Sequence, residues 1–329
     1  MYIRYLFTAV FAAMMITGCT KDFNLTLPDT MPHYVIEGRI SNLKGPYYVR
    51  ITKSTSLLGL GNQQDLNTRD SGLEAVTGAQ VIVSDDMGLS DTLTPAVTKG
   101  PLRYFYIYKN GQIDSAQDQR YCDLFTSERG YYQTTKITGI PAHIYRLTVK
   151  IGDSVFHASA YMPVVPTLDS AALTETVVDP AGTKGFLPYA WFQEPQHEKN
   201  YYLLQYNNIA DYRYDIPYGH AVVSETSPYY VTDDKVLPPY VNGMAVRVTS
   251  SGHSQYGGGY YYLMVREPLQ LRLSSLTKES YEYFLALGRQ FEDDGNIYKP
   301  VPASANGNIS GGALGLFWAT HVSYKMILP

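Results

Sequence analysis

The sequence predicts a mainly β protein. It should begin with an antiparallel β-sandwich, immunoglobulin-like or transthyretin-like, and continue into a second β-rich domain with one C-terminal α-helix. Two patterns in the 329 residues predict this class. Apolar and polar residues alternate with a period of two in many short runs separated by Gly, Pro, Asn and Asp, as in half-buried strands. Helical spacing appears only after residue 277.

The N-terminal domain is expected over residues 33–165. Residues 33–41 and 46–54 alternate clearly, and the sequence Asn-Leu-Lys-Gly between them favours a β-hairpin. Residues 57–77 are polar and rich in Gly, Asn and Asp, so a long loop is expected there. Seven or eight short strands joined by turns favour a sandwich. The other strands are expected at residues 79–85, 89–97, 103–110, 130–137, 144–151 and 155–162.

A break in the alternation separates this domain from a second one, expected over residues 166–329. The sequence from Pro163 to Ser170 contains two prolines and interrupts the strand pattern, which is typical of a domain boundary. Further strands are expected at residues 189–194, 200–208, 211–217, 244–250, 260–267 and 269–276.

One α-helix is expected near residues 277–291. Tyr281, Phe284 and Leu285 follow the i, i+3, i+4 spacing that places side chains on one helix face, where they would pack on the second sheet. Thr277 is in position to cap the helix N-terminus. The second half of residues 312–328 alternates again and is expected to form a closing strand.

The N-terminus is typical of an exported protein. An apolar run at residues 5–16 follows Arg4, and it is too short for a membrane-spanning helix, which needs about 20 apolar residues. Residues 1–18 are therefore interpreted as a signal peptide. The tetrad at residues 16–19, Ile-Thr-Gly-Cys, resembles the lipobox of bacterial lipoproteins, which predicts cleavage between Gly18 and Cys19 and lipid on the Cys19 sulfur. The alternative is an ordinary signal peptide with an incidental cysteine.

A lipidated Cys19 would hold the protein on a membrane surface, because several acyl chains together give stable anchoring. Residues 19–32 are polar, contain two prolines and are expected to be a tether. Thr20, in place of Asp, resembles the pattern for transfer to the outer membrane. Lys21 followed by a single acid leaves two locations open, the periplasmic face and the cell surface.

The residues give no catalytic, metal or cofactor motif. His197 and Glu198 begin the zinc motif H-E-x-x-H, but Tyr201 stands where the second histidine belongs. Cys122 is expected to be a small hydrophobic residue rather than a nucleophile. A net charge of −4 does not favour nucleic-acid binding, which needs a clustered basic face. A calcium site assembled from distant loops is left open.

Tyrosine is unusually frequent, with 31 residues against 11 Phe and two Trp. Tyr256, Tyr260, Tyr261 and Tyr262 surround the Gly257–Gly259 run, and such a loop suits recognition of a glycan or a protein, because Tyr gives large contact area at low entropic cost. The alternative is ordinary strand packing, in which the ring lies on the sheet and the hydroxyl reaches water.

The chain resembles a family across most of its length, the domain-of-unknown-function family 4249. The resemblance rests on several segments in a fixed order: residues 34–41, 47–54, 78–83, 130–132, 145–149, 194–202, 274–284 and 306–317. The family comprises lipoproteins of Bacteroidetes often encoded beside TonB-dependent receptors. It supplies no established activity, so the resemblance implies an envelope location and a role beside uptake machinery, with a receptor or an exported glycan or peptide as partner.

Two functions of different kinds follow. The first is a lipid-anchored outer-membrane protein that is not an enzyme and binds a partner as an accessory to a TonB-dependent uptake system. The second is a hydrolase, for example a glycosidase, whose acid and base come from dispersed carboxylates such as Asp215, Glu225 and Glu267. Such a pair must face each other across about 5 to 10 Å, which a sequence does not reveal.

Overall fold

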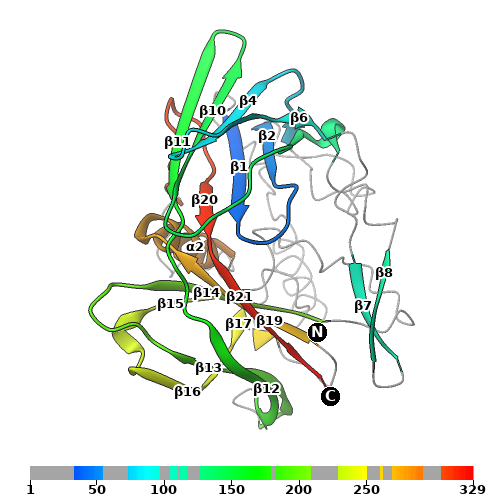
Figure 1. The fold of residues 1–329 in the computed structure, drawn as a ribbon, viewed down its shortest axis with the longest axis vertical. Coiled ribbons are helices and arrows are strands. Elements are labelled where there is room, and N and C mark those ends of the chain that lie inside the picture. The colour runs from blue at the N-terminus through cyan, green and yellow to red at the C-terminus, as the bar shows by residue number, and fades with distance from the viewer. Residues whose placement is uncertain are drawn as a thin grey trace, which may run out of the picture. The chain divides into compact units, whose positions relative to one another are not determined.

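The structure is a computed structural model that describes residues 33–54, 73–96, 104–109, 112–117, 126–178, 182–208, 229–249, 260–261, 269–291 and 305–328. These residues form several sheets, mostly antiparallel, and one α-helix near the C-terminus (Figure 1). The predicted fold class, mainly β with one C-terminal helix, is confirmed.

The first sheet is built on the hairpin expected at the start of the domain. β1 and β2 pair antiparallel, and their alternate apolar side chains, including Ile36, Ile40, Val49 and Ile51, are buried. β20 joins the free edge of β1 in parallel, the one departure from antiparallel pairing in this sheet. The strands are β1 (Tyr34–Ser41), β2 (Tyr48–Ser54), β3 (Leu73–Ala75), β6 (Thr94–Pro95), β9 (Tyr131–Gln133) and β20 (Phe317–Thr320).

The second sheet runs in the order β11, β10, β4, β5. Strict alternation along β10 and β11 turns one face of each strand inward, and Gly152, at φ +58°, allows the tight turn between them. Inward side chains of both sheets form one buried cluster, so they make a first sheet pair. The strands are β4 (Gln80–Asp85), β5 (Ser90–Thr92), β10 (Ile144–Ile151) and β11 (Ser154–Tyr161).

A second sheet pair follows residue 165. Its three-stranded sheet has β13 in the centre, its four-stranded sheet has β14 and β19 in the centre, and apolar side chains from both form a second cluster. The strands are β12 (Leu168–Val177), β13 (Lys184–Gln193) and β16 (Tyr240–Ala245) in one sheet, and β14 (Tyr201–Asn208), β15 (Tyr230–Asp233), β19 (Leu269–Leu276) and β21 (Val322–Ile327) in the other.

Smaller elements complete the described chain. Two strand pairs stand apart from these sheets, and two short 3₁₀ helices lie in connections. They are β7 (Tyr104–Lys109) with β8 (Gln112–Gln117), β17 (Val248–Thr249) with β18 (Tyr260–Tyr261), η2 (Ser127–Arg129) and η3 (Asp234–Val236).

The helix α2 (Lys278–Phe291) forms where the apolar spacing predicts it. The backbone N–H of Ser280 donates to Oγ1 of Thr277 at 3.2 Å, which is the expected N-cap. Phe284 is buried in a third cluster with Tyr201, Leu203 and Trp318, on the side of the β14–β19 sheet opposite the second cluster. The helix therefore covers the outer face of this sheet.

The C-terminal segment, residues 317–327, contributes a strand to each of the two sheet pairs. The closing strand expected from the sequence is interrupted at His321: β20 lies beside β1 in the first pair, and β21 pairs with β19 in the second (Figure 1). Phe317 belongs to the first cluster and its neighbour Trp318 to the third, because successive strand residues point to opposite faces. A boundary after residue 165 therefore leaves one strand of the first pair in the C-terminal part of the sequence.

We predict that Phe317→Ala lowers the free energy of unfolding by about 3 to 5 kcal/mol, because it removes a fully buried ring from the first cluster. Urea unfolding followed by fluorescence measures the change. Tyr324→Ala, at a 48 % exposed position on β21, is the control and should cost little. A loss below about 1 kcal/mol for Phe317→Ala would show that β20 does not complete the first core.

Candidate functional site

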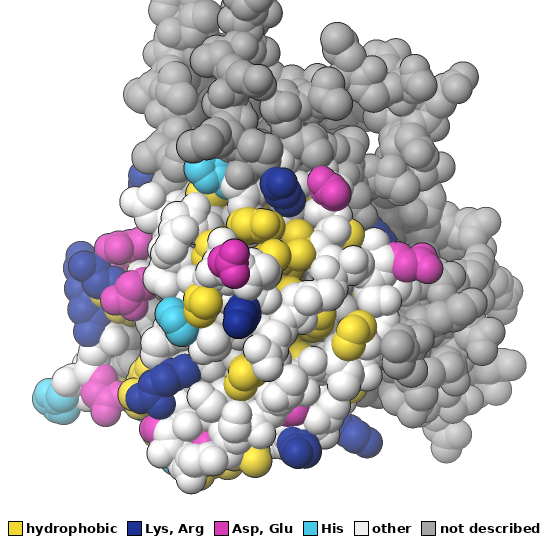
Figure 2. Space-filling view, turned by 90° about the horizontal axis from the view of Figure 1, so that it is seen from above, with side chains coloured by type: hydrophobic (Ala, Val, Ile, Leu, Met, Phe, Trp, Pro, Cys, Tyr) yellow, Lys and Arg dark blue, Asp and Glu magenta, His cyan; other side chains and the backbone are white. Residues whose placement is uncertain are grey.

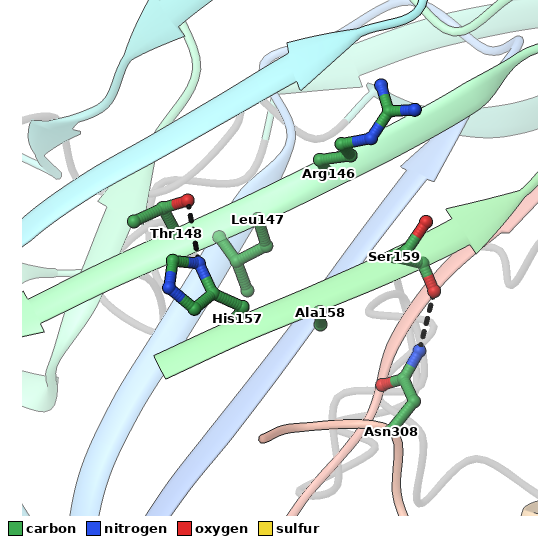
Figure 3. Close-up of a pocket in the computed structure, with 7 residues that line it drawn as sticks. All are labelled: Arg146, Leu147, Thr148, His157, Ala158, Ser159 and Asn308. Carbon is green, nitrogen blue, oxygen red and sulfur yellow. Dashed lines mark hydrogen bonds between the residues drawn. The ribbon is translucent and has the colours of Figure 1, made fainter. Parts of the chain in front are cut away.

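An open cleft lies over the β10–β11 hairpin. Its volume is about 370 Å³, and its outward side chains are polar or charged (Figure 3). Period-two alternation places Arg146 and Thr148 of β10, and His157 and Ser159 of β11, on the exposed face. The lining residues are Arg146, Leu147, Thr148, His157, Ala158, Ser159 and Asn308.

Hydrogen bonds within the cleft hold the hairpin and the chain that crosses it. Oγ1 of Thr148 lies 3.2 Å from Nδ1 of His157 (Figure 3). Asn308 Nδ2 donates to the carbonyl oxygens of Ser159, at 3.0 Å, and Phe317, at 2.7 Å, while its Oδ1 accepts from the Phe317 N–H at 2.9 Å. Asn308 thus joins β11 to β20 and closes the first sheet pair at this edge, a structural task that leaves it little freedom to bind a ligand.

A buried carboxylate marks the loop between β13 and β14. Glu194 is only 2 % exposed, and its Oε1 accepts from Asn200 Nδ2 at 3.0 Å. The backbone N–H of Asn200 donates to Asp234 Oδ2 at 3.0 Å. Asn200 therefore donates hydrogen bonds to two carboxylates, those of Glu194 and Asp234. Burial raises the pKa of Glu194 and the charge of Asp234 adds to the rise, whereas the nearby Tyr202 hydroxyl and Asn200 oppose it.

The same loop lies beside a second buried polar group, the hydroxyl of Tyr202. Oε2 of Glu194 and the hydroxyl of Tyr202 are both buried, and neither makes a well-formed hydrogen bond to a described residue. His197 and Glu198 lie exposed in the same loop. Within the described ranges, no three His, Cys, Asp or Glu side chains come close enough to hold a metal ion. The carboxylates considered for hydrolysis, Asp215, Glu225 and Glu267, lie outside the described residues.

A row of aromatic and amide side chains covers part of the outer face of the three-stranded sheet. Along β13, Phe192 and Ala190 point into the second cluster, so Tyr189, Trp191 and Gln193 point outward. Their register partners on β12 and β16 point outward with them. We call this set the aromatic face, and its members are Ser170, Ala172, Tyr189, Trp191, Gln193, Tyr240, Asn242 and Ala245.

Trp191 is fixed at the centre of the aromatic face. Its indole Nε1 donates to Oδ1 of Asn242, the residue opposite it on β16, at 3.0 Å. Its ring lies against Gly243, where an added Cβ would stand 3.1 Å from Trp191 Cζ2 and where φ is +78°. Glycine therefore makes room for the ring. The ring of Tyr189 lies 6.4 Å from that of Trp191, centroid to centroid.

The side chains predicted from the sequence fall mainly outside the described residues. Gly18, Cys19, Cys122, Tyr256 and Tyr262 lie outside them. Tyr260 and Tyr261 form β18, whose backbone pairs with β17, but their side chains are outside the description. The tyrosine loop therefore stays a prediction.

The aromatic face was missed at the sequence level, although one signal for it is present. Residues 189–194 read Tyr-Ala-Trp-Phe-Gln-Glu, which predicts a strand with aromatic rings on both of its faces. Alternation alone does not say which face is buried. Asn242, on a strand 51 residues further along, has no local mark that links it to Trp191.

Charged side chains of both signs are interspersed on the face of the molecule drawn in Figure 2, around a group of hydrophobic side chains. Neither sign gathers there into a broad patch. No helix among the described residues has both the length and the apolar character needed to cross a membrane.

Comparison with known proteins gives one family. A family model described as "Domain of unknown function (DUF4249)" matches residues 20–326, nearly the whole chain. No curated protein matches the sequence.

We predict that Glu194→Gln stabilises the fold at about pH 8 and that the gain shrinks as the pH falls to about 4. A carboxyl group whose folded pKa is raised binds its proton more tightly when folded, so folding stability falls as the pH rises from the unfolded pKa through the folded pKa. Glutamine keeps the acceptor for Asn200 and carries no charge. Urea midpoints at both pH values measure the effect, with Glu198→Gln as an exposed control. A stability difference independent of pH would contradict the prediction.

Proposed function

The chain belongs to the family described as domain of unknown function DUF4249, and from that membership we propose a lipid-anchored, non-catalytic binding protein of the outer membrane. In this role it would be an accessory to a TonB-dependent uptake system. Three features support the proposal: the lipobox-like tetrad, the polar segment that follows it, and the aromatic face.

The anchor is supported by the N-terminal sequence. An apolar run too short to span a bilayer ends at Cys19, and residues 20–32 provide a polar, proline-containing spacer before the first strand begins at Tyr34. A spacer of this kind gives a folded domain reach from the membrane surface. Whether the domain faces the periplasm or the cell exterior is part of what the anchor experiment decides.

The aromatic face is the observation that carries the binding role. Tyr189 and Trp191 are half-exposed on this face. Trp and Tyr rings supply large contact areas with few rotatable bonds, which is why both residues are enriched at recognition surfaces. Here the ring of Trp191 is already fixed by Asn242 and Gly243, so little conformational entropy remains to be lost on binding. The hydrolase alternative has no comparable support among the described residues.

We predict that Cys19→Ala abolishes lipidation and normal processing. Cells fed radiolabelled palmitate should label the wild-type chain and not the variant, and only the wild-type chain should enter the detergent phase after phase separation. Protease accessibility on intact cells then distinguishes the two faces of the membrane. Cys122→Ser is the matched control and should behave as wild type. A Cys19→Ala chain that still incorporates palmitate would overturn the anchor.

The binding role is tested by capture from solubilised envelopes. The tagged full chain is used as bait, and both proteins and carbohydrate in the eluate are measured. We expect the wild-type chain to retain a component that Trp191→Ala loses, because the fixed ring is removed, and that Tyr324→Ala retains. Identical eluates from the wild type and Trp191→Ala would contradict a binding role for the aromatic face.

A further inference from the structure

We propose that the aromatic face binds a neutral glycan, with sugar rings stacked on Trp191 and Tyr189 and their hydroxyls bonded to Asn242 and Gln193. This inference rests on the binding role proposed above and names the ligand class for it. It follows from the shape, the hydrogen-bonding groups and the charge of the face.

The rings are arranged for stacking on a flat ligand face. Tyr189 and Trp191 are two residues apart on the central strand, and their planes differ by 36°, so neither ring stands edge-on to the other. The face of an aromatic ring is electron-rich and attracts C–H groups with partial positive charge. A sugar ring presents such C–H groups on its faces and hydroxyls around its edge.

Small residues on the neighbouring strands leave these two half-buried rings partly accessible. Ser170 stands opposite Trp191 on β12, and Ala172 stands opposite Tyr189. Ala245 stands opposite Tyr189 on β16. The side chains opposite the two rings on β12, and opposite Tyr189 on β16, are therefore smaller than the rings. Leu187, the next outward residue of β13, is fully buried, which ends the exposed part of the face on that side.

The amide groups beside the rings offer both kinds of hydrogen bond that hydroxyls need. Oδ1 of Asn242 accepts from the Trp191 indole, which leaves the Asn242 N–H groups without a partner among the described residues. Nε2 of Gln193 donates to the carbonyl oxygen of Pro239 at 2.7 Å, which leaves Oε1 of Gln193 as an acceptor. A hydroxyl group both donates and accepts, so one sugar edge can use both amides. Tyr240, 43 % exposed opposite Gln193, adds a phenolic hydroxyl.

The lack of charged side chains on the aromatic face favours an uncharged ligand. None of the eight side chains of the aromatic face is charged, so the face offers no cation for a phosphate, sulfate or carboxylate group. Asp169, exposed at the bulge beside Ser170, would repel an anionic ligand. An apolar peptide fits less well, because polar amides and small residues surround just two aromatic rings.

The test is the mobility of the full chain, kept in detergent, in native gels. The gels contain amylopectin, xyloglucan, galactomannan or mixed-linkage β-glucan, or polygalacturonate as the anionic comparison. We expect at least one neutral polysaccharide to slow the wild-type chain and polygalacturonate not to. Trp191→Ala and Tyr189→Ala should each lower the affinity, measured from the retardation, about tenfold or more, a change of about 1.4 kcal/mol in binding free energy.

Control variants separate recognition from folding. Tyr324→Ala removes an exposed tyrosine from β21 and should keep the retardation. Trp191→Phe keeps an aromatic ring and loses the bond to Asn242, so it should bind better than Trp191→Ala. Thermal melts must show that each variant is folded at the temperature of the gel.

The outcomes distinguish the ligand class from the binding role. Retardation by polygalacturonate alone, by none of the neutral polysaccharides, or to the same degree in Trp191→Ala overturns the glycan proposal. If the gels are negative while the wild-type chain captures a protein from envelopes that Trp191→Ala loses, the partner is a protein and the binding role stands. If both experiments are negative, the binding role falls with the glycan.

Discussion

One extended segment, residues 317–327, is the constraint on which the rest of the described structure depends. Its first part completes the sheet of β1, and its second part completes the sheet of β19. Phe317 and Trp318 enter different buried clusters, although they are adjacent in the chain. The segment therefore fixes the two sheet pairs to each other through backbone hydrogen bonds and core packing at once.

Hydrogen bonds from three parts of the chain hold the backbone at His321, where β20 ends and β21 begins. The Ser275 hydroxyl donates to the Pro163 carbonyl at 2.6 Å and accepts from the His321 N–H at 3.0 Å. The N–H of Val165 donates to Nδ1 of His321, which requires that nitrogen to be unprotonated. Burial lowers the pKa of His321, and this favours the same neutral form. Asn42 bonds to both backbone groups of Val322, so the first sheet pair also takes part.

Local sequence patterns were enough to predict the strands and the helix that bury one face. β1, β2, β4, β10 and β11 alternate clearly, and α2 has both its apolar face and its cap in the sequence. The start of β12 was assigned to a boundary because two prolines precede it, and the rest of β12 has a weak pattern because only Leu168 and Leu173 of its side chains are buried. The parallel pairing of β20 with β1 has no local signature, since its partners are about 280 residues apart. The same limit hides the contact of Trp191 with Asn242.

The distance between β1 and β20 also sets the order in which the protein can be completed. Synthesis delivers the N-terminus first, so the edge of β1 and the pocket for Phe317 stay uncovered until almost the whole chain has been made. An uncovered strand edge pairs readily with other chains. Chaperones therefore have a defined target during this interval, and any proteolytic cut that removes β20 and β21 opens the first buried cluster as well as the second.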